Sequence, residues 1–163
     1  MTSGLRLGLP VALLLLIVDQ ASKWWILEVL RLPEVGRIEV LPFLNLTMVW
    51  NRGVTFGLLA GEAWWHQYVL AAIATAVAVA LVVWMRRAEN RLIAVSLGLV
   101  LGGAVGNVID RVRFGAVVDF VDVHAYGWHW YVFNVADSAI VIGVGLLLAD
   151  ALLRPRSGGN EVR

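Results

Sequence analysis

The stretch YVLAAIATAVAVALVVWM (68–85) carries no charged side chain. A helix that crosses a bilayer needs about 20 mostly apolar residues, and this stretch nearly reaches that length by itself. Three further apolar runs flank it, so we expect four membrane-spanning helices, at about residues 7–27, 63–85, 92–109 and 133–153. The sequence therefore predicts a membrane α-helical fold.

The composition indicates the same class. Of the 163 residues, 60% are hydrophobic and 15% are charged, whereas soluble domains carry about 25% charged residues. We expect one integral membrane domain over residues 1–163, with a disordered polar tail at about 154–163. The net charge of +1 gives no reason to expect nucleic acid as a partner. The absence of cysteine excludes disulfides, a thiol nucleophile and thiolate metal sites.

The first apolar run could also be a secretory signal peptide, because Arg6 precedes LPVALLLLIV (9–18). No cleavage site of the A-x-A type follows it, so we favour a spanning helix. Asp19 and Lys23 lie four residues apart in its second half and share a helix face. An internal ion pair that lets both groups enter the membrane is favoured over a direct chemical role.

Basic residues indicate the orientation of the chain. The short turn RRAENR (86–91) is densely basic, which is typical of a cytoplasmic loop. We therefore expect both termini in the cytoplasm, although the bias in bases alone is small, at seven inside against six outside. Seven of the eight tryptophans, all but Trp84, then lie at or beyond the outer membrane surface.

Two segments on that outer side have the character of strands. Residues 28–62 contain the β-prone run NLTMVWN (45–51), and residues 110–132 contain the alternating run VVDFVDV (117–123). We expect a small β-rich extracytoplasmic segment on the membrane surface. On such a strand Asp122 faces away from Asp119, so we expect Asp122 to be solvated.

Gly98, Gly102 and Gly106 recur at four-residue spacing in the third apolar run. This spacing puts them on one helix face and predicts a seam where another helix packs closely. Asn107 and Asp110 continue that helix towards its outer end.

Carboxylates at membrane depth need a reason, since one at the bilayer centre costs about 2.5–3.5 kcal/mol on insertion scales. Asp119 and Asp137 are such residues, with Asp110 nearby. Two carboxylates held close together can activate a water molecule, which suggests an aspartyl hydrolase. Asn134 and Asp137 also have a structural interpretation, as a capping pair at the start of the last helix.

Other hydrolytic classes have little support. No H-E-x-x-H motif indicates a zinc site, and no serine stands in a G-x-S-x-G setting. We interpret His124 and His129 as amphipathic residues of the membrane interface.

Five short blocks carry a resemblance to a known family. They are DQASK (19–23), NRGVTF (51–56), GGAVGNVIDR (102–111), VVDF (117–120) and FNVADS (133–138). In this order, over nearly the whole chain and across a four-helix plan, they resemble the signature blocks of the lipoprotein signal peptidases (signal peptidase II). The family often has a proline shortly before FN-x-AD, where this chain reads WHWYVFN (128–134).

The resemblance implies a multi-pass aspartyl endopeptidase of the bacterial inner membrane with its active site at the extracytoplasmic face. It would remove signal peptides from prolipoproteins by cleaving before a diacylglyceryl-modified cysteine, without metal or cofactor. Partners would be these substrates, membrane lipid and globomycin-type inhibitors. Carried over by motif, the catalytic residues are Asp119 and Asp137, the substrate-binding residues Asn51, Asn107, Arg111 and Asn134, and the structural supports Asp19, Lys23 and Asp110.

Two alternatives from other classes stay open at this point. A small membrane transporter or proton channel would also use intramembrane carboxylates, but it predicts acids spaced along the membrane depth. Here Asp110, Asp119, Asp122 and Asp137 are all predicted at one face. A scaffold protein would tolerate replacement of Asp119 and Asp137 by asparagine.

Overall fold

The computed structural model describes residues 2–53 and 65–153. Within these ranges, four helices are long and apolar enough to cross a membrane. They are α1 (Ser3–Trp24), α3 (His66–Met85), α4 (Arg91–Phe114) and α5 (Val135–Leu153). A π-helical segment, η1 (Trp25–Val29), extends α1. The predicted four-helix membrane fold is therefore confirmed.

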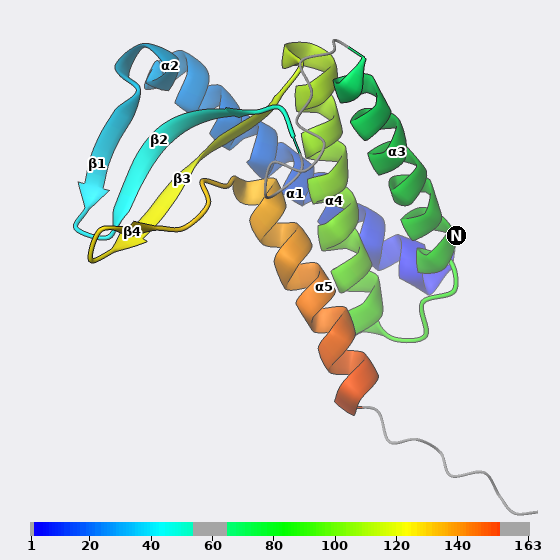
Figure 1. Ribbon diagram of the computed structural model, residues 1–163. Coiled ribbons are helices and arrows are strands. Elements are labelled where there is room, and N and C mark those ends of the chain that lie inside the picture. The colour runs from blue at the N-terminus through cyan, green and yellow to red at the C-terminus, as the bar shows by residue number, and fades with distance from the viewer. Residues whose placement is uncertain (1, 54–64, 154–163) are drawn as a thin grey trace, which may run out of the picture.

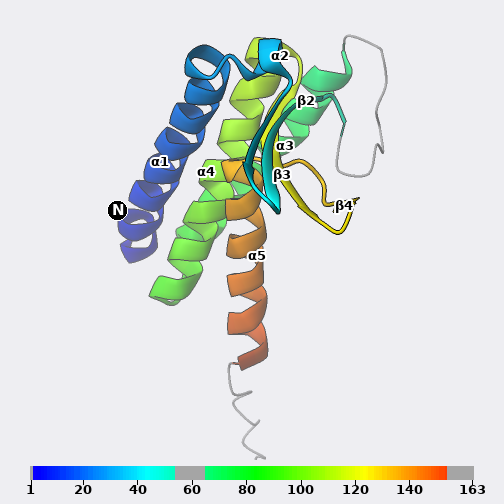
Figure 2. The same ribbon diagram turned by 90° about the vertical axis from the view of Figure 1, so that its left-hand side faces the viewer.

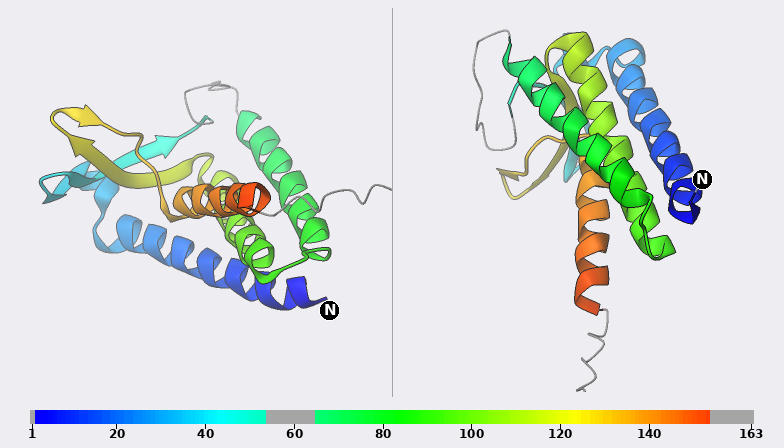
Figure 3. Two further views of the ribbon diagram at one scale, coloured as in Figure 1. Left: turned by 90° about the horizontal axis from the view of Figure 1, so that it is seen from below. Right: turned by 90° about the vertical axis from the view of Figure 1, so that its right-hand side faces the viewer.

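Helix α4 lies at the centre of the bundle and packs against α1, α3 and α5 (Figures 1 and 3). It is the most buried of the four spans in the described part of the chain. Its side chains Leu97 and Leu101 join a core cluster with Ala12 of α1 and Leu81 of α3. Because α4 contacts all three neighbours, its polar residues can bridge elements that do not otherwise meet.

The predicted glycine seam at Gly98, Gly102 and Gly106 runs along the face of α4 that meets α1. A Cβ atom at Gly102 would lie 2.6 Å from the carbonyl oxygen of Ala12, so only glycine permits this approach. One turn further on, a Cβ atom at Gly106 would meet the carboxylate of Asp19. The seam thus brings Asp19 against α4, close to the end of the bundle where the sheet joins the helices.

The predicted β-rich segment is a four-stranded antiparallel sheet beside the bundle (Figures 1 and 2). The strand order is β1-β2-β3-β4, and the short helix α2 (Leu32–Val35) precedes β1. The strands are β1 (Arg37–Leu41), β2 (Leu44–Asn51), β3 (Val117–Ala125) and β4 (Trp128–His129). Strand β3 follows α4 directly, so the sheet is tied to the central helix.

The sheet has its own apolar core against η1 and α2. Ile26, Leu32, Val118 and Phe120 are all buried there. Side chains alternate across a strand, so Asp119, between Val118 and Phe120, is directed to the opposite face of β3. Asp119 therefore faces away from η1 and α2 and towards Asn134 at the start of α5.

Helix α4 continues to Phe114, beyond the predicted end at 109. The helix does not stop at Asp110 and Arg111 because the side chains of both residues find partners inside the protein. It ends where Gly115 adopts a left-handed conformation with φ of 67°. The last turns of α4, beyond the predicted span, thus carry polar residues of the site.

The other helix ends also differ from prediction. Helix α1 begins at Ser3 rather than 7, and η1 carries it to Val29 rather than 27. Helix α5 begins at Val135 rather than 133 because Asn134 caps it. The predicted start of the second helix at 63 and the predicted tail at 154–163 lie outside the described residues.

The start of α1, the connection from α3 to α4 and the end of α5 lie at the end of the bundle away from the sheet (Figure 1). Because the number of spans is even, the start of the first span and the end of the fourth lie on the same side of the membrane. The predicted site residues gather at the other end, where the sheet joins the helices.

Candidate active site

Asp119 and Asp137 come together where β3, α4 and α5 converge. Asp119 lies in β3 and is 1% exposed. Asp137 lies in the first turn of α5 and is half-buried. The charge of Asp137 acts on Asp119, so the two carboxyl groups share one electrostatic environment.

Amide side chains hold both carboxyl groups in place. Asn134 and Asn51 donate to the two oxygens of Asp119, at 2.7 and 2.9 Å. Asn107 donates to Asp137 at 2.8 Å and accepts a hydrogen bond from Asn134 at 3.2 Å. Asn107 and Asn134 therefore link the two aspartates through a continuous hydrogen-bonded path.

Asn134 satisfies both interpretations drawn from the sequence. Its Oδ1 accepts from the backbone N–H of Asp137 at 2.9 Å, which caps α5. Its Nδ2 donates to Asp119 and, at 3.3 Å, to the carbonyl of Val118. Asn134 thus caps α5 and is at the same time part of the polar site.

The environment of Asp119 favours its protonated form. Burial, and to a smaller extent the charge of Asp137, raises the pKa of Asp119 to about 7. Hydrogen bonds from Asn51 and Asn134 act in the opposite direction without cancelling it. A carboxyl group of this kind can hold a proton near neutral pH beside a second carboxylate.

Arg111 supplies positive charge at the edge of the site. Its guanidinium donates to the backbone carbonyls of Asn107 and Gly53, at 3.3 and 3.4 Å. Its charge interacts most strongly with Asp137 and then with Asp119. Its Nε is buried and has no hydrogen-bond partner among the described residues. A donor of this kind can bind a substrate carbonyl.

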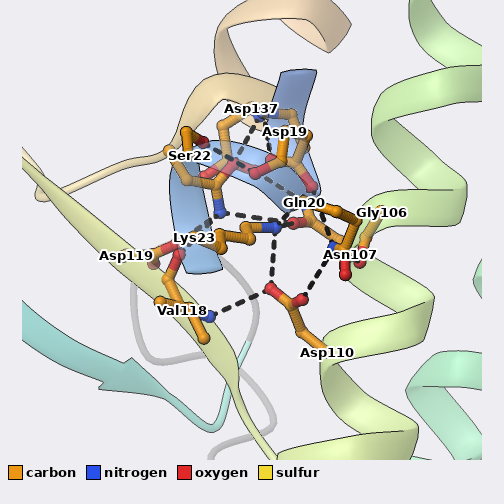
Figure 4. Close-up of polar contacts among 12 residues, drawn as sticks. Asp19, Gln20, Ser22, Lys23, Gly106, Asn107, Asp110, Val118, Asp119 and Asp137 are labelled. Carbon is orange, nitrogen blue, oxygen red and sulfur yellow. Dashed lines mark hydrogen bonds and ion pairs between the residues drawn. The ribbon is translucent and has the colours of Figure 1, made fainter. Parts of the chain in front are cut away.

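Asp19, Lys23 and Asp110 form a buried ionic triad next to Asp119 and Asp137 (Figure 4). The Nζ atom of Lys23 lies 2.9 Å from Asp19 and 2.7 Å from Asp110. It also donates to the Oδ1 of Asn107 at 3.2 Å. The predicted ion pair between Asp19 and Lys23 is present, and Asp110 is a second partner that spacing along the sequence could not indicate.

Replacing Lys23 is expected to destabilise the protein more than replacing Asp19. In Lys23→Met the carboxylates of Asp19 and Asp110 lose their common cation, and breaking a buried ion pair costs about 3–5 kcal/mol. In Asp19→Asn the ammonium keeps Asp110 as its partner. Thermal unfolding in detergent should show a larger fall in midpoint for Lys23→Met. Equal midpoints would contradict a triad centred on Lys23.

Asp122 is buried, so the prediction that it is solvated is wrong. It does face away from Asp119, but β2 and β4 enclose it: Thr47 donates to it at 2.9 Å and Asn45 at 3.3 Å, and His129 bonds it at 2.8 Å. Burial acts to raise the pKa of Asp122, but these hydrogen bonds outweigh it and hold the pKa below its usual value. Asp122 thus connects β3 to β2 and β4, and it is not part of the pair formed by Asp119 and Asp137.

Several contributors to the polar network were not singled out from the sequence. Gln20 donates to both Asp19 and Asp110, at 3.2 and 3.1 Å. Its signal was its position beside Asp19 in an apolar helix. His129, interpreted as an interface residue, also bonds to Asp122 and stacks on His124 with ring centroids 4.9 Å apart. No spacing rule pointed to that contact.

Aromatic side chains project from the end of the protein that bears the sheet. Trp128 and Trp130 are 84% and 70% exposed, and Trp65 is 48% exposed. Trp64, predicted to accompany Trp65, lies outside the described residues. Indole rings prefer the level of lipid headgroups, so their exposure fits a surface in contact with lipid.

Comparisons with known proteins agree with this arrangement. Residues 11–153 match the family described as signal peptidase (SPase) II. A lipoprotein signal peptidase of Methylorubrum extorquens (strain PA1) is 47% identical over 98% of this chain and 94% of its own length. One from Methylobacterium radiotolerans is 48% identical over 90% of this chain and 86% of its own length.

Solved structures show the same fold. A bacterial membrane enzyme determined by the in meso method at 2.3 Å resolution superposes with a TM-score of 0.79 and 34% identity. The match covers 96% of this chain and 93% of that chain. Since the family match includes both aspartates and reaches into all four helices, the chain belongs to the signal peptidase II family.

Proposed function

We propose that this chain is an aspartic endopeptidase that removes signal peptides from bacterial prolipoproteins, with Asp119 and Asp137 as its catalytic pair. Its family supports the reaction, since relatives are named lipoprotein signal peptidase. The observation that carries the catalytic assignment is the pair of carboxyl groups joined by hydrogen bonds through Asn107 and Asn134. One of these groups, Asp119, has a pKa of about 7.

The mechanism follows from the protonation of the pair. Asp119 holds a proton because it is the more buried group, and Asp137 accepts a proton from a water molecule lying between them. The resulting hydroxide adds to the scissile carbonyl while Asp119 donates a hydrogen bond to the developing oxyanion. Proton transfer to the amine then releases the two peptides, so one water is consumed for each bond cleaved.

The substrate is an extended peptide whose backbone groups need partners near lipid. Asn51, Asn107, Arg111 and Asn134 line the pair and are the proposed substrate-binding residues. Among the described residues, the Nε of Arg111 is buried without a hydrogen-bond partner, so Arg111 is the best placed of the four to receive a substrate carbonyl. Crowding by these side chains favours small residues beside the scissile bond. Globomycin-type cyclic peptides would occupy the same place.

The proposed topology puts both termini in the cytoplasm and the aspartates at the extracytoplasmic face of the inner membrane. The basic turn RRAENR (86–91) lies at the end of the bundle away from the sheet, which supports this orientation (Figure 1). The diacylglyceryl group of the substrate would then stay in the outer leaflet while its cysteine reaches the site.

A transporter or proton channel is not favoured. That class requires ionisable groups along the depth of the membrane. In the described residues, the carboxyl groups of the site lie together at the end of the bundle that bears the sheet (Figure 4).

The pH dependence of cleavage tests the proton assignment. Because the raised pKa of Asp119 is about 7, the working state with Asp119 protonated is lost as pH rises through that value. We expect kcat/KM for a diacylglyceryl-modified precursor to fall about tenfold for each pH unit well above 7. A rate that keeps rising to pH 9 in stable, folded enzyme would contradict a protonated Asp119.

A further inference from the structure

Two carboxylates outside the proposed catalytic pair hold the backbone beside each member of that pair. Asp19 accepts a hydrogen bond from the backbone N–H of Ala136 at 3.0 Å, one residue before Asp137. Asp110 accepts one from the backbone N–H of Val118 at 3.2 Å, one residue before Asp119. Each proposed catalytic aspartate thus has an anchored neighbour in the chain.

The two anchoring carboxylates are joined to each other through α1. Lys23 contacts Asp19 at 2.9 Å and Asp110 at 2.7 Å, and all three residues are at most 2% exposed. Gln20 makes a second bridge, donating to Asp19 at 3.2 Å and to Asp110 at 3.1 Å. Figure 4 shows this cluster between the start of α5 and β3.

We propose that Asp19, Lys23 and Asp110 are positioning residues that set the separation between Asp119 and Asp137. The proposal rests on the catalytic role proposed above for that pair. Asp119 and Asp137 stand on a strand and on a helix, and the triad connects the backbones of these two elements. A stabilising ion pair alone would not require each carboxylate to bind the backbone next to a proposed catalytic residue.

Separation matters because the two carboxyl groups must share one proton. Their repulsion varies inversely with distance and is strong in a site of low dielectric constant. Strong coupling keeps the two titrations far apart and gives a broad range of pH in which only one group is protonated. If the pair moves apart, the coupling weakens and that range narrows.

Other charges also face the pair and must be held constant in a test. They are Arg111 from α4 and Lys23 from α1, and the charge of Asp110 acts on Arg111. Any neutral residue at 110 changes this field. We therefore compare two neutral replacements, Asp110→Asn and Asp110→Ala, which differ in the acceptor offered to Val118. Both leave Lys23 paired with Asp19.

The experiment measures kcat and KM across pH for the two variants and the wild type, with a diacylglyceryl-modified precursor in detergent. Asp110→Asn keeps an oxygen for the N–H of Val118 and should retain most of the width of the pH profile. Asp110→Ala should narrow the profile by about one pH unit and lower kcat about tenfold or more, with KM little changed, because displacement of a catalytic group affects the chemical step.

If Asp110→Ala does not fold, the same comparison at the other end uses Asp19→Asn and Asp19→Ala, where the lost acceptor serves Ala136. Equal pH profiles and equal kcat per folded molecule for the alanine and asparagine variants would overturn the positioning role and leave only stability. A wild type that fails to cleave the precursor would instead refute the proposed function.

Discussion

Asp119→Asn and Asp137→Asn are each expected to lower kcat at least about a thousandfold while the protein still inserts and folds. Asparagine matches the shape of aspartate but neither takes a proton from water nor supplies one to the leaving amine. In the proposed mechanism, each member of the pair works only with the other in the opposite protonation state. The double variant should therefore be little worse than either single one, since residues that act as a unit are not additive.

Asp122→Asn is the matched control for this experiment. Asp122 lies on the same strand as Asp119 and is also buried, but its partners are Asn45, Thr47 and His129. The control should lose stability and keep most of its kcat per folded molecule. Substantial turnover by either Asp119→Asn or Asp137→Asn would remove that residue from the catalytic pair.

The second large effect concerns the lipid on the substrate. A precursor of the same sequence without the diacylglyceryl group is expected to be cleaved about a hundredfold more slowly, even when it is inserted in the membrane. In the proposed reaction the lipid would hold the cysteine at a fixed depth, and a displacement of about 1 Å from the reacting groups can cost about a hundredfold in rate. Buried acyl chains also retain the substrate at about 0.8 kcal/mol per CH₂.

The measurement for this prediction compares kcat/KM for the two precursors in the same bilayer, with matched surface concentrations. Matching is needed because part of the lipid's contribution merely keeps the substrate in the membrane. Similar values for the two precursors would show that the lipid is not recognised. The protein would then be better described as a general membrane aspartic protease.

The spans were predictable from the sequence because a run such as 68–85 has no other stable environment than lipid or a protein core. Their ends were less predictable. The third span was predicted to end at about 109, yet Asp110 and Arg111 find partners in α1 and at Gly53 and lie within α4. Hydropathy counts such residues as exposed charge and cannot register partners that are distant in the sequence.

The residues of the site were likewise predictable only in part. Asp119 and Asp137 could be predicted from the free-energy cost of a carboxylate at membrane depth and from their motifs. The structure brings them together with Asn107 and Asn134. The burial of Asp122 could not be foreseen, because it depends on the register that sets Asn45 opposite it and on the return of β4. Alternation along one strand tells which way a side chain points but not what covers it.

The bridging role of Lys23 also lay beyond the sequence. Spacing on one helix identified Asp19 as its partner, whereas the contact with Asp110 requires the close approach of α1 and α4 at Gly106. This contact changes the expected effect of Asp19→Asn, because Lys23 keeps a counter-ion in that variant.

One measurement tests the central claim most directly. Purified wild type, Asp137→Asn and Asp122→Asn are incubated with a diacylglyceryl-modified prolipoprotein in water enriched in oxygen-18, and the products are analysed by mass spectrometry. We expect wild type and Asp122→Asn to release a signal peptide that ends just before the modified cysteine and carries one solvent oxygen in its new carboxyl group. Asp137→Asn should release almost none. Cleavage by Asp137→Asn at a rate close to that of the wild type would contradict water activation by Asp119 and Asp137.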